Sequence, residues 1–463
     1  MIKITNTLTG QKEEFSPTKD KKVNMFVCGP TVYDHSHIGH ARTYIFFDVV
    51  AKYLRHRGYK LKYLMNITDV DDKIIDRAKR EGQSTKDLAK KFEKSFYEDI
   101  KSLKIDNVDK FARATDYIKQ IVKQVEALAA KGSAYKIEND GYYFDLSTFP
   151  DYGKLARRTI EQAEDAVSRI DESVNKRNKG DFALWKLSKP GEPTWKSSLG
   201  AGRPGWHIED TAISDYHFGP QYDLHGGAVD LVFPHHEAEI AQQESVSGKK
   251  PFVKYWLHSG FLTVNGRKMS KSLGNFITIK DIIKKYSPEV IRMMALSVYY
   301  RSPLDFNKSV IKQSQAGVNR IYEFYQKLNL SDGKGPKNIE KEIEKTRRKF
   351  TSSMDDDFNT PQALAVLFEF IRSVNTSLTG NYLDKKSLES AKKLLNETDR
   401  VLGIIPIKQE KIPEEVLELV EKREKLREEK NWQEADKIRT SIDKLGYQVE
   451  DTVYGSLTSR LKT

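Results

Sequence analysis

Two short strings in the chain carry residue types that could neutralise phosphate groups. His37-Ile38-Gly39-His40 lies near the start, and Lys268-Met269-Ser270-Lys271-Ser272 lies past the middle. Imidazoles at the beginning of a helix add hydrogen-bond donors beside the positive end of the helix dipole. A loop with two lysines can close over a triphosphate and open again after the reaction. Such groups suit the negative charge that develops on phosphates when ATP is attacked.

A third set of residues could hold a metal ion. Cys28 is the single cysteine of the chain, which excludes an intrachain disulfide and leaves it as a core residue, a nucleophile or a ligand. His235 and Glu239 are four residues apart, so on a helix they share one face. Thiolate, imidazole and carboxylate are ordinary zinc ligands. By itself, the His235 and Glu239 pair is more typical of a helix without a metal than of a metal site.

The composition of the chain is typical of a protein without membrane-spanning helices. The chain has 463 residues, of which 38% are hydrophobic and 31% charged. This length predicts roughly two to four compact units. The sequence contains no apolar run near the roughly 18 residues of a spanning helix, and its first residues lack a signal-peptide core, so we expect a cytoplasmic location. The net charge of +12 suits a phosphate-rich partner but does not identify one.

The elements that position these residues follow a βαβ order. Residues 23–27 and 61–67 are predicted strands, and a helix is predicted to begin at the histidine string between them. Charged helical patterns fill roughly 75–133, and a more irregular stretch extends to about 200. A second α/β segment is predicted over 205–262, and the sequence from Ser287 onward is predicted to be mostly helical. The pattern predicts one nucleotide-binding α/β domain in two halves, with an insertion between them.

The two strings resemble the signature motifs of class I aminoacyl-tRNA synthetases, and longer segments resemble the cysteinyl-tRNA synthetase family specifically. The similarity is dense from about residue 20 to 310 and thinner beyond. The matching segments are Phe26 to Asp34, Asn66 to Ile74, Asp181 to Lys186, Gly202 to Glu209, His225 to Gly227 and Phe233 to Glu237.

This resemblance implies a Rossmann-type catalytic domain followed by a helical bundle and a small anticodon-binding domain. It implies that the protein activates L-cysteine with ATP and transfers it to the 3′-terminal adenosine of tRNA(Cys). The expected domains are a first catalytic half at 1–120, an insertion at 121–204, a second half at 205–265, a lysine-loop and stem-contact region at 266–315, a bundle at 316–405 and an anticodon domain at 406–463.

The resemblance also assigns roles to single residues. His37, His40, Lys268 and Lys271 are expected to stabilise the transition state of adenylation, with Mg²⁺ accompanying the ATP. The expected ATP-binding residues are Gly39, Gly227, Asp230 and Lys271. The expected amino-acid pocket consists of Cys28, Thr31, Thr68 and Trp206.

The family holds one zinc ion that coordinates the substrate thiol. A hydrophobic pocket separates near-isosteres by no more than roughly 10²-fold, whereas zinc prefers a thiolate to the hydroxyl of serine. The expected ligands here are Cys28, Asp210, His235 and Glu239. Many members have cysteine where this chain has Asp210, so a metal-free pocket with a hydrogen-bonding aspartate stays an alternative.

The C-terminal third resembles the family's anticodon-binding region. A base could stack on Trp432, while Arg427, Asp436 and Asp451 could read base edges. The alternative is a solvated charged helix anchored by Trp432. Three other functions compete with this one: a ligase that joins activated cysteine to an amino sugar, a stand-alone nucleotidyltransferase, and a non-catalytic RNA-binding paralogue. The tail at 406–463 disfavours the amino-sugar ligase. The length of the chain disfavours a stand-alone nucleotidyltransferase, and the intact histidines and lysines disfavour a non-catalytic paralogue.

Overall fold

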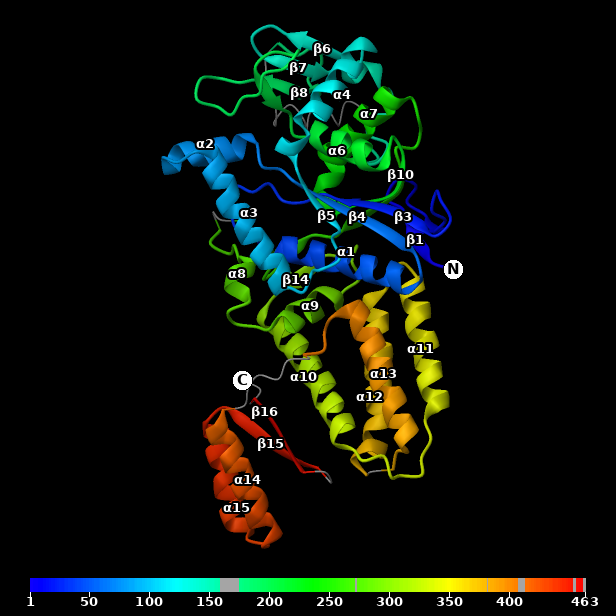
Figure 1. The fold of residues 1–463 in the computed structure, drawn as a ribbon, viewed down its shortest axis with the longest axis vertical. Helices are drawn as coiled ribbons and strands as arrows, with labels where there is room; N and C mark the ends of the chain where they lie inside the picture. Colours follow the sequence, from blue (N-terminus) through cyan, green and yellow to red (C-terminus); the bar gives the residue numbers. More distant parts are fainter. Residues whose placement is uncertain (159–174, 271–272, 381, 407–412, 453–454, 461–463) are drawn as a thin grey trace. The chain divides into compact units, whose positions relative to one another are not determined.

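The computed structural model describes residues 1–158, 175–270, 273–380, 382–406, 413–452 and 455–460 (Figure 1). The chain forms two compact units. The first consists of Met1–Tyr286, Val298–Phe306 and Asp355–Phe358, and the second consists of Ser287–Ser297, Asn307–Met354 and Asn359–Thr463.

The first unit is built on a parallel five-stranded sheet in the order β11-β10-β3-β4-β5. The apolar segments predicted at 23–27 and 61–67 form two of its three inner strands, β3 and β4. The five strands are β3 (Lys22–Val27), β4 (Lys60–Ile67), β5 (Lys110–Arg113), β10 (Tyr222–Ala228) and β11 (Val253–Ser259).

The strand order reverses between β3 and β10. From β3 the chain continues outward through β4 and β5, whereas β10 and β11 lie on the other side. The Cys28 N–H donates a hydrogen bond to the Gly226 carbonyl (3.0 Å), which extends the pairing just past the end of β3. In open parallel sheets, ligands bind outside the carboxyl ends of the strands at such a reversal. The fold therefore places Cys28 where a ligand is expected.

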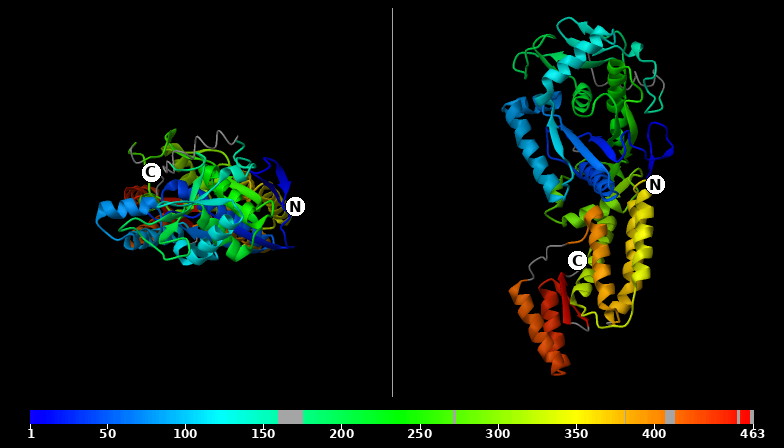
Figure 2. Two further views of the ribbon diagram at one scale, coloured as in Figure 1. Left: turned by 90° about the horizontal axis from the view of Figure 1, so that it is seen from above. Right: turned by 45° about the vertical axis from the view of Figure 1, so that its right-hand side comes forward.

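Helix α1 (Ile38–His56) begins at the same edge of the sheet and runs along it (Figures 1 and 2). Its buried face is strongly apolar and includes Ile45, Phe46, Val49 and Val50. The carboxyl end of β4 leads into α2 (Asp72–Glu81), which is followed by α3 (Thr85–Ser102) and, after β5, by α4 (Ile118–Ala130).

The prediction of continuous helix over roughly 75–133 was wrong at β5. This edge strand has only four residues, with charged ends and a single buried side chain, Ala112. So short a segment has no periodicity that distinguishes it from the charged helices on either side.

The segment at 134–204 contains a small antiparallel sheet in the order β6-β7-β8-β9. Its strands are β6 (Ala134–Ile137), β7 (Gly141–Phe144), β8 (Phe182–Leu187) and β9 (Gly202–Pro204). Helices α6 (Ile208–Phe218) and α7 (Glu237–Ser247) then pack against each other and against α4. The unit also contains β1 (Lys3–Thr5), β2 (Lys12–Glu14), β12 (Leu262–Val264), β13 (Arg267–Lys268), β14 (Leu304–Phe306) and α8 (Ile279–Ile282).

The second unit is mostly helical, as predicted. Long helices, drawn yellow-green to orange in Figures 1 and 2, form a bundle with apolar inner faces. The helices are α9 (Pro288–Leu296), α10 (Lys308–Leu330), α11 (Glu340–Asp355), α12 (Thr360–Thr379) and α13 (Lys385–Leu402). None of the helices in the described part of the chain is long and apolar enough to cross a membrane.

The last segment has its own small core. Helices α14 (Glu414–Glu428) and α15 (Trp432–Lys444) pack against each other, and β15 (Tyr447–Thr452) pairs with β16 (Gly455–Arg460). The core consists of Val416, Val420, Ile438, Ile442, Tyr447 and Val449.

Candidate active site and metal centre

His37 and His40 cap the first turn of α1 with their own imidazoles. The His37 Nδ1 accepts hydrogen bonds from the backbone N–H groups of Gly39 (3.1 Å) and His40 (3.3 Å). The His40 Nδ1 accepts in return from the His37 N–H (3.3 Å). This reciprocal arrangement is a capping box, usually formed by a hydroxyl and a carboxylate, and it satisfies N–H groups that the helix leaves unpaired.

The cap also determines which nitrogen of each ring carries the proton. A neutral imidazole whose Nδ1 accepts a hydrogen bond is protonated on Nε2, so both rings present an N–H donor. The two rings are stacked, with centroids 3.7 Å apart. Burial lowers the pKa of His37 to about 4 and lowers that of His40 well below its usual range. Near neutral pH the pair is therefore a set of neutral hydrogen-bond donors rather than a pair of cations.

We predict that the free energy of unfolding decreases as the pH falls from about 6.5 to 4. The lowered pKa of His37, about 4, means that the unfolded chain binds this proton near pH 6.5 while the folded chain does not. Each such histidine contributes a slope of up to about 1.4 kcal/mol per pH unit. Urea unfolding at several pH values measures the slope. His37→Asn keeps a capping acceptor without a titrating group, and an unchanged slope in this variant would contradict the assignment.

The lysine motif is held close to the histidine motif by the segment that follows it. The Ile38 N–H donates to the Ile277 carbonyl (3.1 Å), and the Phe276 ring meets the His37 ring edge-on at 5.4 Å. Within the loop, the Asn275 side chain donates to the Lys268 carbonyl (3.1 Å) and accepts from the Ser270 N–H (2.9 Å). The two motifs, more than 200 residues apart in the chain, therefore meet.

Of the two lysines, Lys268 ends β13 and is exposed, while Lys271 lies outside the described residues. The predicted role of Lys271 therefore stays a prediction.

The predicted adenosine residues are distributed along this same edge. Gly227 lies in β10, where an added Cβ would come within 2.9 Å of the His236 ring, and Asp230 is exposed just beyond the strand. At Gly39 an added Cβ would come within 2.9 Å of the His37 ring. Glycine at this position is therefore already required by the histidine cap, and its predicted role beside ATP remains a prediction.

The structure brings Cys28, Asp210, His235 and Glu239 together in one buried cluster. The Cys28 Sγ lies 3.1 Å from the Asp210 Oδ2, and the His235 Nε2 lies 3.1 Å from the same oxygen. The Glu239 Oε1 is 3.2 Å from the His235 Nε2. These four ligand atoms all lie within 4.8 Å of one another.

The charges of this cluster favour a cation. Burial raises the pKa of the Cys28 thiol well above its usual range, and the nearby carboxylates Asp210 and Glu239 raise it further. Burial, and then Asp210, also raises the pKa of Glu239. Groups of like charge that are removed from water need a positive partner to ionise together. The donor set therefore fits a divalent metal such as zinc.

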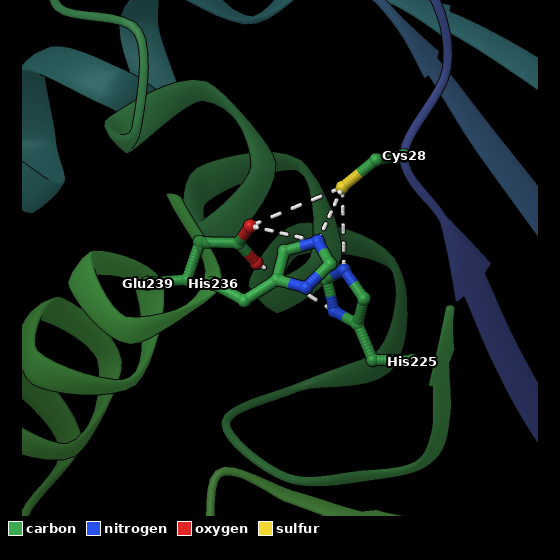
Figure 3. Close-up of side chains that lie close together, drawn as sticks. All are labelled: Cys28, His225, His236 and Glu239. Carbon is green, nitrogen blue, oxygen red and sulfur yellow. Dashed lines mark hydrogen bonds and ion pairs between the residues drawn. The ribbon is translucent and has the colours of Figure 1, made fainter. Parts of the chain in front are cut away.

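A second ligand set shares two members of the first (Figure 3). The Cys28 Sγ lies 3.1 Å from the His236 Nε2 and 3.4 Å from the His225 Nε2, with the Glu239 Oε1 at 4.0 Å. The Nδ1 of His236 is hydrogen-bonded to His258 (2.8 Å), and the Nδ1 of His225 is hydrogen-bonded to the Tyr222 hydroxyl (2.5 Å). The roles of His225 and His236 as possible ligands were not predicted from the sequence. The i,i+3 spacing of His236 and Glu239 was the available signal.

The predicted amino-acid pocket adjoins the cluster. The Trp206 ring stacks on the His235 ring, with centroids 4.4 Å apart. Thr31 and Thr68 face each other across the ends of β3 and β4, where the Val32 N–H donates to the Thr68 carbonyl (3.1 Å). The structure thus gathers the four predicted pocket residues at one end of the sheet.

Three of the four predicted anticodon residues lie together in the C-terminal segment. The Arg427 guanidinium lies 5.2 Å above the ring of Trp432, which is 53% exposed. The Asp451 carboxylate is bound by Arg423 (2.6 and 2.7 Å) and lies 3.3 Å from Arg427. Asp436 is exposed on α15, four residues after Trp432. An exposed ring beside a fixed guanidinium is a stacking surface, whereas Asp451 already has ionic partners.

Three parts of the chain match known protein families. Residues 14–316 match the family described as "tRNA synthetases class I (C) catalytic domain", and residues 349–406 match the "DALR domain". Residues 409–454 match the "Cysteinyl-tRNA ligase anticodon binding domain".

Curated relatives match the whole chain. The chain is 45% identical to the cysteine–tRNA ligase of Thermococcus gammatolerans, covering 100% of this chain and 99% of that protein. It is 44% identical to the cysteine–tRNA ligase of Caldicellulosiruptor saccharolyticus, covering 100% of both.

Solved structures with this fold are class I synthetases. A Mycobacterium tuberculosis methionyl-tRNA synthetase in complex with methionyl-adenylate has a TM-score of 0.61 at 16% identity, covering 82% of this chain and 89% of that one. An Agrobacterium radiobacter leucyl-tRNA synthetase has a TM-score of 0.62 at 10% identity, covering 84% and 85%. These similarities confirm the predicted fold class. The matches to the catalytic domain and to full-length relatives show that the chain belongs to the cysteine–tRNA ligase family of class I aminoacyl-tRNA synthetases.

Proposed function

We propose that this chain joins L-cysteine to ATP, releases pyrophosphate, and transfers the cysteinyl group to the 3′-terminal adenosine of tRNA(Cys). The observation that carries the proposal is the buried Cys28, Asp210, His235 and Glu239 cluster at the sheet edge where α1 begins with its two capping histidines. The cluster suits a thiol substrate, and the two capping histidines suit phosphate groups. The anticodon-domain match at residues 409–454 favours tRNA over an amino sugar as the acceptor.

In this proposal the reaction has two steps. The cysteine carboxylate attacks the α-phosphate of ATP and pyrophosphate leaves, while the Nε2–H groups of His37 and His40 donate to phosphate oxygens. Lys268 and Lys271 neutralise the leaving pyrophosphate, and Mg²⁺ accompanies the ATP. The adenosine 2′-hydroxyl of the tRNA then attacks the activated carbonyl and AMP leaves. Positioning and charge stabilisation suffice, so no side chain acts as a covalent nucleophile.

Zinc is the proposed metal, one ion per chain, because both ligand sets share Cys28 and Glu239. We assign Cys28, Asp210, His235 and Glu239 as its ligands. His235 also supports Trp206, so this set lies beside the amino-acid pocket. When bound, zinc supplies a soft Lewis acid that prefers thiolate to hydroxyl.

Cysteine-dependent ATP–pyrophosphate exchange tests this function. Chelated protein should lose exchange and regain it with added Zn²⁺, and serine should not compete. His235→Ala should lower the zinc content more than His225→Ala or His236→Ala does. Exchange that survives chelation with serine still rejected would contradict the zinc role, and absence of exchange with cysteine would contradict the substrate.

Trp432→Ala should weaken tRNA charging while leaving exchange unchanged. Because Trp432 is 53% exposed, its loss removes a stacking surface without opening the core of the segment. Stacking on an aromatic side chain contributes about 1–3 kcal/mol per base, so the KM for tRNA should rise roughly 5- to 100-fold. Charging and exchange assays on the same preparation measure the two effects. Equal losses in both would refute the anticodon role.

A further inference from the structure

Glu209 is a buried carboxylate with only one of its two oxygens bound. Its side chain is 1% exposed, and its Oε1 accepts a hydrogen bond from the Thr68 hydroxyl (2.5 Å). The Oε2 is also buried and has no hydrogen-bond partner among the described residues. Leaving such an atom unpaired is unfavourable, and more so for a charged group. A native protein that retains this cost is expected to gain from it elsewhere.

The position of Glu209 places this oxygen beside the proposed cysteine pocket. Glu209 precedes the cluster residue Asp210 on α6, and its partner Thr68 follows β4, the strand next to the one that Cys28 follows. The Asn66 amide, also on β4, donates to the Asp210 Oδ1 (2.5 Å). The two consecutive carboxylates are therefore both hydrogen-bonded to residues at the carboxyl end of β4, one of which is the predicted pocket residue Thr68.

The charges around Glu209 are negative. The ionisable groups that act most strongly on it are Asp210, Asp69 and Asp71. A divalent metal ion would offset two of the three negative charges that Cys28, Asp210 and Glu239 carry as ligands, so it would leave the charge of Glu209 available for a second cation. Cysteine brings such a cation, because its ammonium group is only two carbon atoms away from its sulfur. A thiol held at the cluster therefore keeps the ammonium close to it.

We propose that Glu209, together with the Thr68 hydroxyl, binds the α-ammonium group of the cysteine substrate. This assignment rests on the proposed function, and it divides the recognition of cysteine into two parts. The metal cluster selects the thiol, while Glu209 selects an amino acid over a thiol acid of the same shape. The third group, the carboxylate, is then left free to face the phosphates.

Three ligands that differ by one group test the assignment on zinc-loaded, full-length protein. They are L-cysteine, 3-mercaptopropionate, which lacks the amino group, and cysteamine, which lacks the carboxylate. In the unmodified protein, cysteine should bind far more tightly than 3-mercaptopropionate. Glu209→Gln keeps the shape and removes the charge, so it should weaken cysteine and cysteamine by at least about 30-fold. The affinity for 3-mercaptopropionate should change less than about threefold, and the zinc content should remain one per chain.

A matched control is Glu237→Gln, which removes a carboxylate that is equally buried. The Glu237 Oε2 accepts from the backbone N–H groups of Leu155 and Ala156, away from Thr68, so the preference for cysteine over 3-mercaptopropionate should persist. Equal loss of cysteine and 3-mercaptopropionate in Glu209→Gln would overturn the assignment, as would equal affinities in the unmodified protein. Failure of the proposed function is a different result: no cysteine-dependent exchange in the unmodified protein.

Discussion

Cys28→Ser is expected to abolish zinc binding and to raise the KM for cysteine in ATP–pyrophosphate exchange by about 100-fold or more. Cys28 supplies the only thiol of the chain to both ligand sets, and serine offers zinc a hydroxyl that stays protonated near neutral pH. Loss of a residue that only hydrogen-bonds to a metal ligand typically weakens metal binding or activity 10- to 100-fold. Loss of a ligand itself should have an effect at least as large. Rejection of serine should fall to the roughly 10²-fold that a pocket without a metal achieves.

Metal analysis and exchange kinetics on one preparation measure both effects. Asp210→Cys is the matched control, because it restores the ligand that many members of the family have at this position. This variant should keep one zinc per chain and remain active with cysteine. An unchanged cysteine KM in Cys28→Ser would show that Cys28 is not a ligand.

His40→Ala is expected to lower the rate of cysteinyl-adenylate formation about 10²- to 10³-fold, the usual loss when one preorganised donor is removed from a developing charge. Cysteine affinity should change little, because His40 caps α1 and is not part of the metal cluster. The lost cap should also destabilise the protein by about 1 kcal/mol.

His40→Glu separates these two effects. Glutamate at this position completes a capping box and suits the positive end of the helix dipole, so stability should recover. It cannot donate a hydrogen bond and it repels phosphates, so the reaction should be slower than in His40→Ala. Thermal unfolding and exchange assays on both variants provide the comparison. An activity that followed stability across the two variants would show that His40 acts through the helix alone.

The main elements could be predicted from the sequence because each depends on local spacing, whereas the full metal cluster could be predicted only through the family resemblance. The apolar run at 23–27 became β3, and the spacing of His235 and Glu239 brought both side chains to one point. The prediction of Asp210 beside Cys28 came from the family resemblance, and the two side chains are in contact.

Other features depend on tertiary structure and could not be predicted in this way. The contact of His225 with Cys28 requires β10 to pair with β3, which no local pattern reveals. The unpartnered oxygen of Glu209 likewise becomes visible only when α6 is placed against the end of β4. The capping role of the two histidines was hidden by their resemblance to a catalytic motif, although the two roles use different nitrogens of the same rings.

The central pairing of β3 with β10 has a consequence for how the chain is made. The two strands are separated by almost 200 residues, which a ribosome adds in roughly 10–40 s at 5–20 residues per second. During that time β3 is an open edge with the apolar side chains of Val23, Met25 and Phe26. Open apolar edges recruit other strands. Nascent chains that stop before β10 should therefore aggregate, whereas longer chains that include β10 close the edge, and the addition of α7 then supplies Glu239 to the cluster around Cys28.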